Sequence, residues 1–185
     1  MDLTVYQTPT NCSGDTRNLV LIGMPGVGKS TVGVLLAKAL SRSFIDTDVY
    51  IQAREGRQLQ DIIDTDGPDS FRGIEAQHVL SLDCRAHVIA TGGSVVYSAA
   101  AMRHLKARGI ALYMRLPLPL LLDRLTNIDS RGVVMTPGQS VEDLFEEREA
   151  LYERYADVTV DCQGITHEQT VARIVDATER WFDSS

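Results

Sequence analysis

The chain has 185 residues, of which 44% are hydrophobic and 23% charged, and its formal net charge is −7. This length suits one well-packed domain and is short for two, and the composition is ordinary for a soluble globular protein. The acidic balance argues against a nucleic-acid-binding surface, which needs a basic stripe, and no apolar run approaches the ~20 residues that cross a membrane.

The first 17 residues are polar and mixed, without the basic start and apolar centre of a secretory signal. We therefore expect a flexible N-terminal tail over residues 1–17 and a single domain over residues 18–185. The three cysteines are widely scattered and show no C-x-x-C spacing, so neither a disulfide framework nor a zinc site is indicated. Reduced thiols fit a cytoplasmic protein. None of the four histidines has a ligand-spaced partner, and we expect each to be a surface or structural residue.

The most specific motif lies over residues 23–31, which read Gly-Met-Pro-Gly-Val-Gly-Lys-Ser-Thr and match G-x-x-x-x-G-K-[ST] at every fixed position. An apolar strand-like run (19–22) precedes it and a helical pattern (32–40) follows. The glycines let backbone N–H groups turn inward around phosphate oxygens at the positive end of the helix dipole. The motif therefore predicts a nucleoside triphosphate site made by Gly26, Val27, Gly28, Lys29, Ser30 and Thr31.

Apolar runs alternate with helical patterns along the rest of the chain. We expect further strands at residues 43–45, 87–90, 110–114 and 158–160. Helical patterns are centred on residues 59–63, 71–82, 98–107, 141–154 and 166–182. This alternation predicts an α/β fold, with a parallel five-stranded sheet and helices on both faces. Ligands of such folds sit outside the carboxyl ends of the strands.

One segment, residues 126–140, breaks the compact pattern with small polar residues, glycine and proline around a single arginine. We interpret it as a mobile lid of the kind that excludes water during phosphoryl transfer. A solvated surface loop is the alternative.

Two acids, Asp46 and Asp48, follow the second strand-like run. Strand alternation would send both side chains to the same side, where they face the triphosphate only if a cation is present. Magnesium held by Ser30 and Asp46 would supply that cation, and Asp48 could accept the proton of a substrate hydroxyl. The alternative is a solvated turn that caps the next helix.

Two arginines and a glycine turn indicate the second substrate. Arg72 is one helical turn from Glu75, and we expect the two to pair and orient the guanidinium, the alternative being an energetically minor surface pair. The turn Gly92-Gly93-Ser94 offers close backbone approach to a ligand oxygen. With Arg148, these residues predict a pocket for a small hydroxylated carboxylate. A guanine-selective Asn-Lys-x-Asp segment is absent from the sequence, which argues against a GTPase.

Five segments occur together: the P-loop, Phe-Ile-Asp-Thr-Asp, Phe-Arg-Gly-Ile-Glu, Thr-Gly-Gly, and Arg-Glu-Ala-Leu-Tyr-Glu-Arg-Tyr-Ala-Asp. In order and approximate spacing they resemble the shikimate kinase family, over residues 19–181. The resemblance implies a P-loop kinase fold and ATP-dependent phosphorylation of shikimate to shikimate 3-phosphate with Mg²⁺, a step of aromatic amino acid biosynthesis. We expect a monomer.

The resemblance also implies roles for single residues. Asp48, Arg72, Gly93 and Arg148 would hold shikimate, with Ser94 beside them and the arginines on its carboxylate. Ser30 and Asp46 would serve magnesium, and Lys29 the transferring phosphate. Arg131 matches the family's lid arginine, and Arg124 an arginine that stacks near the adenine. The catalytic set would thus be Lys29, Asp48 and Arg131.

The chain departs from the family pattern at two places. Ser94 stands where the family has a third glycine, and the lid reads Arg-Gly-Val-Val over residues 131–134 in place of Arg-Pro-Leu-Leu. Two other functions therefore stay open. One is a related kinase for another hydroxy acid or polyol, and the other is a catalytically silent, nucleotide-dependent regulatory protein.

Overall fold

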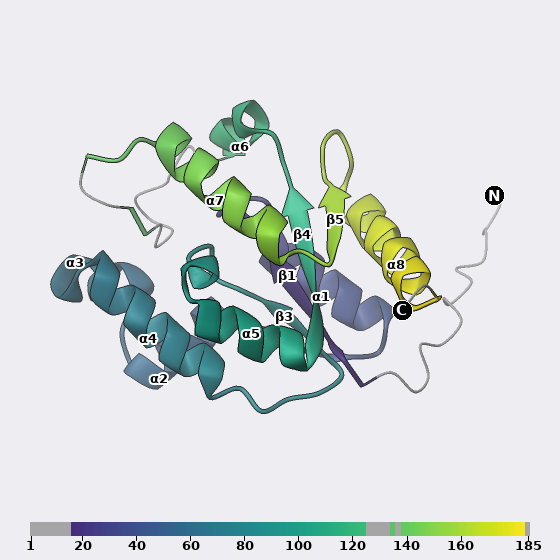
Figure 1. The fold of residues 1–185 in the computed structure, drawn as a ribbon, viewed down its shortest axis with the longest axis horizontal. Helices are drawn as coiled ribbons and strands as arrows, with labels where there is room; N and C mark the ends of the chain where they lie inside the picture. The colour runs from purple at the N-terminus through teal and green to yellow at the C-terminus, as the bar shows by residue number, and fades with distance from the viewer. Residues whose placement is uncertain (1–15, 125–133, 136–137, 184–185) are drawn as a thin grey trace, which may run out of the picture.

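The fold is an α/β sandwich around a parallel sheet, shown in Figure 1. In this computed structural model, the structure describes residues 16–124, 134–135 and 138–183. The strands are β1 (Asn18–Ile22), β2 (Ser43–Asp46), β3 (His87–Ala90), β4 (Gly109–Arg115) and β5 (Val158–Asp161). They lie in the order β2-β3-β1-β4-β5, and every neighbouring pair is parallel. The predicted five-stranded parallel sheet is confirmed.

Helices cover both faces of this sheet. α1 (Lys29–Ala39) and α8 (His167–Asp183) pack together on one face. The other face carries α4 (Pro68–Leu80), α5 (Ala99–Ala107) and α7 (Val141–Tyr155), with the short η1 (Val95–Tyr97) between them. Because both faces are covered, β1 and most of β3 and β4 are buried apolar runs. The order of elements brings the carboxyl ends of β1, β2 and β3 to one edge.

A second, smaller apolar cluster lies beside the main core, between α2 (Thr47–Glu55), α3 (Leu59–Asp66) and α4. Its buried members are Ile51, Leu59, Ile62, Phe71 and Val134. Between β2 and α4 the sequence pattern predicted one helical stretch, and the structure has two helices there, α2 and α3. The chain turns between them at Gly56, whose φ of 65° is left-handed and ends α2.

The segment expected to form a lid is described at residues 134–135 and 138–140, and its remaining residues lie outside the described ones. Val134 belongs to the second apolar cluster. Ser140 begins α7 with a capping box, in which its side chain and that of Asp143 each accept from the other's backbone N–H. Of the predicted tail over residues 1–17, only residues 16 and 17 are described. No helix in the described ranges has both the length and the apolar character that spanning a membrane requires.

Candidate active site

The P-loop connects β1 to α1, and its backbone turns at Gly26 and Gly28, whose φ angles are 82° and 104°. Both values are left-handed, a conformation that residues with a Cβ adopt at a cost. Lys29 follows as the first residue of α1, and its Nζ donates to the carbonyl oxygens of Gly23 (2.7 Å) and Met24 (2.9 Å). The side chain of Lys29 therefore folds back onto the P-loop backbone from the N-terminus of α1.

The charge on Lys29 is set by its surroundings. Burial, together with the positive charge of Arg148, lowers the pKa of its ammonium to about 8. The negative charges of Asp48, Asp46 and Glu75 oppose this decrease. Among the described residues no carboxylate lies within ion-pair distance of Lys29. The lysine is therefore a buried cation at neutral pH that three carboxylates attract from a distance.

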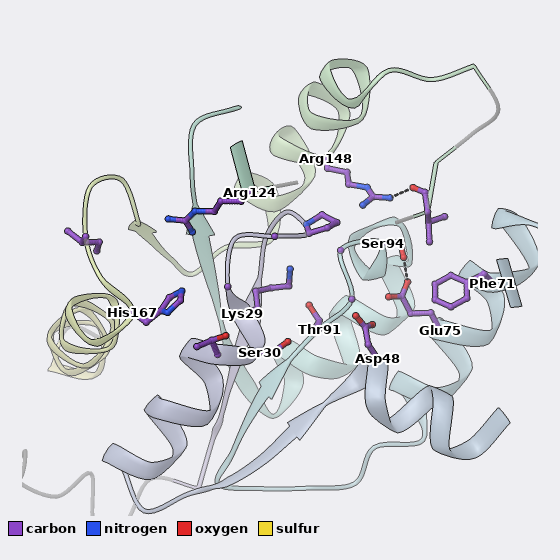
Figure 2. Close-up of a pocket in the computed structure, with 18 of the residues that line it drawn as sticks. Lys29, Ser30, Asp48, Phe71, Glu75, Thr91, Ser94, Arg124, Arg148 and His167 are labelled. Atoms are coloured by element: carbon purple, nitrogen blue, oxygen red, sulfur yellow. Dashed lines mark hydrogen bonds between the residues drawn. The ribbon is translucent and has the colours of Figure 1, made fainter. Parts of the chain in front are cut away.

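A cavity of about 770 Å³ opens above the P-loop. In Figure 2, Arg124 and His167 lie at one end, Phe71, Glu75 and Arg148 at the other, and Lys29 between them. The predicted site residues that line it are Gly26, Gly28, Lys29, Ser30, Thr31, Asp48, Gly93, Ser94, Arg124 and Arg148. Val27, Asp46 and Arg72 are not part of the lining. Arg131 lies outside the described residues.

The acids after β2 are arranged differently from the expectation. Strand β2 ends at Asp46, whose Oδ1 accepts from the backbone N–H groups of Asp48 (3.0 Å) and Val49 (3.3 Å). Asp46 is therefore the N-cap of α2, and Asp48 lies in the first helical turn instead of on a strand. The prediction that strand alternation places both side chains on one side was wrong, because β2 ends at Asp46 and Asp48 is helical. Asp48 nevertheless faces the cavity (Figure 2).

Asp48 is half-buried, and its carboxyl has an unusual proton affinity. Burial and the neighbouring charge of Asp46 together raise its pKa to about 6, and the charge of Lys29 opposes this rise. A carboxyl of this kind is mostly ionised at neutral pH. It is still far closer to accepting a proton than an exposed aspartate is, as an acid–base group should be.

A second carboxyl, that of Glu75, lies beside Asp48, and sequence reasoning did not assign it to the site. It is 1% exposed, and burial raises its pKa to about 7. Its Oε2 accepts from the Ser94 hydroxyl at 2.6 Å, whereas its Oε1 has no hydrogen-bond partner among the described residues. A Cβ on Gly92 would clash with this Oε1 and lie 2.8 Å from Asp48 Oδ1. The bare backbone of Gly92 thus lets the two carboxyls approach.

The expected pair between Arg72 and Glu75 is not formed. Arg72 Nη1 lies 3.3 Å from Oδ1 of Asp69, whose side chain is 94% exposed, and its Cζ lies 4.2 Å from the ring centroid of Tyr97. The spacing along α4 allowed the contact, but Glu75 turns into the interior, where Ser94 is its partner. The expectation failed because spacing along a helix says nothing about a partner from another element.

Arg148 is the largest of the fully buried side chains in the described structure, at 1% exposure. Its Nη2 donates to the carbonyl oxygen of Val134 at 2.5 Å and its Nε to the hydroxyl of Tyr97 at 3.3 Å. In the described part of the chain no carboxylate forms an ion pair with it. A buried cation without a counter-ion is costly, so this guanidinium is suited to an anion that enters the cavity.

The other end of the cavity contains the predicted Arg124 and, opposite it, residues that the sequence analysis did not predict. Arg124, the last residue of α6 (Leu118–Arg124), donates from Nη1 to Val27 O at 3.3 Å. Facing it are residues 165–168, which end the loop after β5 and begin α8. The topology could have revealed this segment, because it follows the carboxyl end of a strand in the parallel sheet. His167, in this segment, lines the cavity, whereas the other three histidines have hydrogen-bond partners elsewhere.

Comparison with known proteins gives the same pattern over nearly the whole chain. The family model described as "Shikimate kinase" matches residues 25–179. A shikimate kinase of Thermodesulfovibrio yellowstonii is 35% identical over 89% of this chain and 96% of its own length. One of Pasteurella multocida is 36% identical over 88% of this chain and 95% of its own.

Solved structures agree with the sequence relatives. A shikimate kinase from Acinetobacter baumannii in complex with shikimate superposes with a TM-score of 0.79 at 31% identity, covering 87% of this chain and 92% of the other. A shikimate kinase from Aquifex aeolicus gives 0.75 at 32%, covering 88% and 96%. Fold, motif order and length all coincide, and the chain belongs to the shikimate kinase family.

Proposed function

We propose that this protein transfers the terminal phosphoryl group of ATP to a hydroxyl of shikimate, giving shikimate 3-phosphate and ADP. The observation that carries this proposal is Arg148, a buried guanidinium without a counter-ion in the described structure, at the end of a cavity that begins at a P-loop. An acceptor that bears a carboxylate would satisfy that charge while its hydroxyls face the phosphates. Family membership supports the same reaction.

At the nucleotide end, the residues of the P-loop bind the phosphates. Backbone N–H groups around Gly26 and Gly28 and the N-terminus of α1 stabilise anionic oxygens. Lys29 exchanges its two carbonyl partners for phosphate oxygens and follows the charge as it moves to the leaving group. Arg124 binds near the base, and Arg131 closes onto the phosphates as the resemblance implies.

At the acceptor end, Asp48 orients the attacking hydroxyl and accepts its proton. The new O–P bond forms as the bond between the γ-phosphorus and the β–γ bridging oxygen breaks, and ADP leaves with that electron pair. The raised pKa of Asp48, about 6, makes its carboxylate a better proton acceptor than an exposed aspartate and keeps it ionised at neutral pH. Arg72 and Arg148 bind the carboxylate, and the backbone of Gly93 also contacts the acceptor.

The oxygen donors near the phosphates fit Mg²⁺. Ser30 offers a hydroxyl at the start of α1, and Asp46 offers the carboxylate oxygen that does not cap α2. Mg²⁺ usually takes one or two protein ligands and completes its shell with phosphate oxygens and water. The described residues accordingly contain no cluster of three or more acidic, histidine or cysteine ligands. When bound, the ion supplies positive charge beside the phosphates.

Ser94 was the residue that kept a different acceptor open. Its hydroxyl is not offered to the cavity, because it donates to Glu75 and the residue is only 3% exposed. A glycine replaced by such an internally bonded serine leaves the backbone approach at Gly93 in place. This contact favours shikimate over another hydroxy acid as the acceptor.

The test is a coupled ADP-release assay with ATP and a panel of hydroxy acids and polyols. We expect shikimate to give the highest kcat/KM, and Arg148→Ala to raise the KM for shikimate tenfold to a hundredfold, since hydrogen bonds to charged groups contribute about 1.5–3 kcal/mol. The KM for ATP should stay within about twofold, a change below 0.5 kcal/mol. Turnover of another acceptor in preference to shikimate, or an unchanged KM in Arg148→Ala, would refute the assignment.

A further inference from the structure

Tyr97 lies between the two arginines proposed to bind the acceptor. It is the half-buried last residue of η1, three residues after Ser94 in the glycine turn. Its ring centroid lies 4.2 Å from the Cζ of Arg72 and 5.3 Å from the Cζ of Arg148. Its hydroxyl also accepts from Arg148 Nε at 3.3 Å. One aromatic side chain therefore contacts two guanidiniums.

The two arginines come from different helices, Arg72 from α4 and Arg148 from α7. η1 contacts both of these helices, so Tyr97 links them through their arginine side chains. Two guanidiniums near one ring repel each other. The negative face of an aromatic ring offsets that repulsion without neutralising either charge.

Neither arginine has a strong anionic partner within the described ranges. Arg72 pairs with Asp69, whose 94% exposed carboxylate is well solvated, and its own Nε is buried without a hydrogen-bond partner there. Arg148 donates to a backbone carbonyl and to the Tyr97 hydroxyl, which are both neutral. Neither charge is neutralised by a buried carboxylate in the described structure, so the pair can respond to an anion that enters the cavity beside Arg148.

We propose that Tyr97 is a positioning residue that aligns Arg72 and Arg148 as one binding site for the carboxylate of the acceptor. The inference rests on the proposed function, because it takes these arginines to be the carboxylate ligands. Tyr97 itself does not line the cavity, so its effect on the acceptor passes through the two guanidiniums. It consequently contributes to selectivity for an acid over an uncharged analogue.

The experiment measures the dissociation constants of shikimate and of its carboxamide analogue, which has no negative charge, by calorimetry in the absence of nucleotide. The dissociation constant of the carboxamide divided by that of shikimate is a ratio that reports how well the site recognises a carboxylate. We expect Tyr97→Leu, which removes the ring, to weaken the binding of shikimate about tenfold and to leave the binding of the carboxamide nearly unchanged. Tyr97→Phe, which removes only the hydroxyl, should weaken the binding of shikimate about twofold to threefold.

Tyr50→Leu is the matched control. Tyr50 also has an arginine over its ring, Arg54 at 5.0 Å, but it does not line the cavity. We expect its ratio of dissociation constants to equal that of the wild type. Thermal unfolding of each variant identifies any loss of fold, and if Tyr97→Leu does not fold, the ratio in Tyr97→Phe decides.

Arg148→Ala separates the two possible failures. If it leaves the ratio unchanged, the proposed carboxylate site is wrong. Suppose instead that Arg148→Ala lowers the ratio, but the Tyr97 variants weaken the binding of both ligands equally or of neither. Tyr97 then only supports the fold, and the inference is overturned. A loss confined to shikimate in the Tyr97 variants supports the positioning role.

Discussion

Replacing Glu75 by glutamine should change how the stability of the protein depends on pH. The carboxyl is 1% exposed, and burial raises its pKa from an ordinary 4.5 to about 7, with Asp48 adding to the rise and Ser94 opposing it. A carboxyl whose pKa is higher in the folded than in the unfolded chain stabilises the fold fully below pH 4.5. That contribution is lost as the pH rises through 7, because the unfolded chain releases its proton first.

The size of the effect follows from the two pKa values. The interval from 4.5 to about 7 corresponds to ~3 kcal/mol of unfolding free energy, at 1.36 kcal/mol for each pH unit. Most of this, about 2–3 kcal/mol, falls between pH 5 and pH 8. A glutamine has no charge to lose, and its amide oxygen can still accept from Ser94. The free energy of unfolding of Glu75→Gln, relative to the wild type, should therefore rise by about 2–3 kcal/mol from pH 5 to pH 8.

Urea denaturation of both proteins at pH 5, 6, 7 and 8, without ligands, measures this difference. Asp48 also has a raised pKa, about 6, and lowers the stability of both proteins over an overlapping range. The comparison between the two proteins at each pH gives the contribution of Glu75 together with its coupling to Asp48. Curves that run parallel from pH 5 to pH 8, separated by a constant, would refute the reasoning.

Three further predictions follow from the site. Lys29→Met should lower turnover at least about a hundredfold in the ADP-release assay while the protein still folds, because it removes a preorganised charge along with two hydrogen bonds inside the P-loop; a variant with wild-type turnover would exclude the role. Asp48→Asn should reduce turnover while calorimetric ATP binding persists, whereas Asp46→Asn should shift the magnesium dependence, so identical magnesium titrations of the two variants would contradict the division of roles. Ser94→Ala should cost about 1–3 kcal/mol of unfolding free energy at pH 8 and less at pH 5, because the bond to Glu75 matters most when that carboxylate is charged; an equal cost at both pH values would argue against it.

The fold could be predicted from the sequence because its signals are local. The strand expected at residues 87–90 coincides with β3, and the other expected strands agree with β2, β4 and β5 within one residue at each end. Buried parallel strands are continuous apolar runs, and helices between them are amphipathic, so each element is visible by itself. The division between α2 and α3 was missed because one glycine with a left-handed backbone separates two polar helices.

The site was predictable where a motif or a strand end marks it, as at Lys29 and Asp48. It was not predictable where the partner of a side chain comes from another part of the chain. Glu75 and Ser94 are 19 residues apart, and Tyr97 and Arg148 are 51 apart. Their contacts depend on how α4, η1 and α7 pack against one another, and the spacing of residues within one element does not predict this packing.

The turn at Gly92 and Gly93 has a consequence for drug resistance. A methyl group on Gly92 would strike Glu75 and crowd Asp48, and one on Gly93 would lie 2.9 Å from Pro25 Cδ and 3.1 Å from Arg148 Nη1. Any substitution here therefore displaces the groups that shape the cavity. An inhibitor that binds mainly to the backbone of this turn would meet a target that cannot change its surface there without distorting its own pocket.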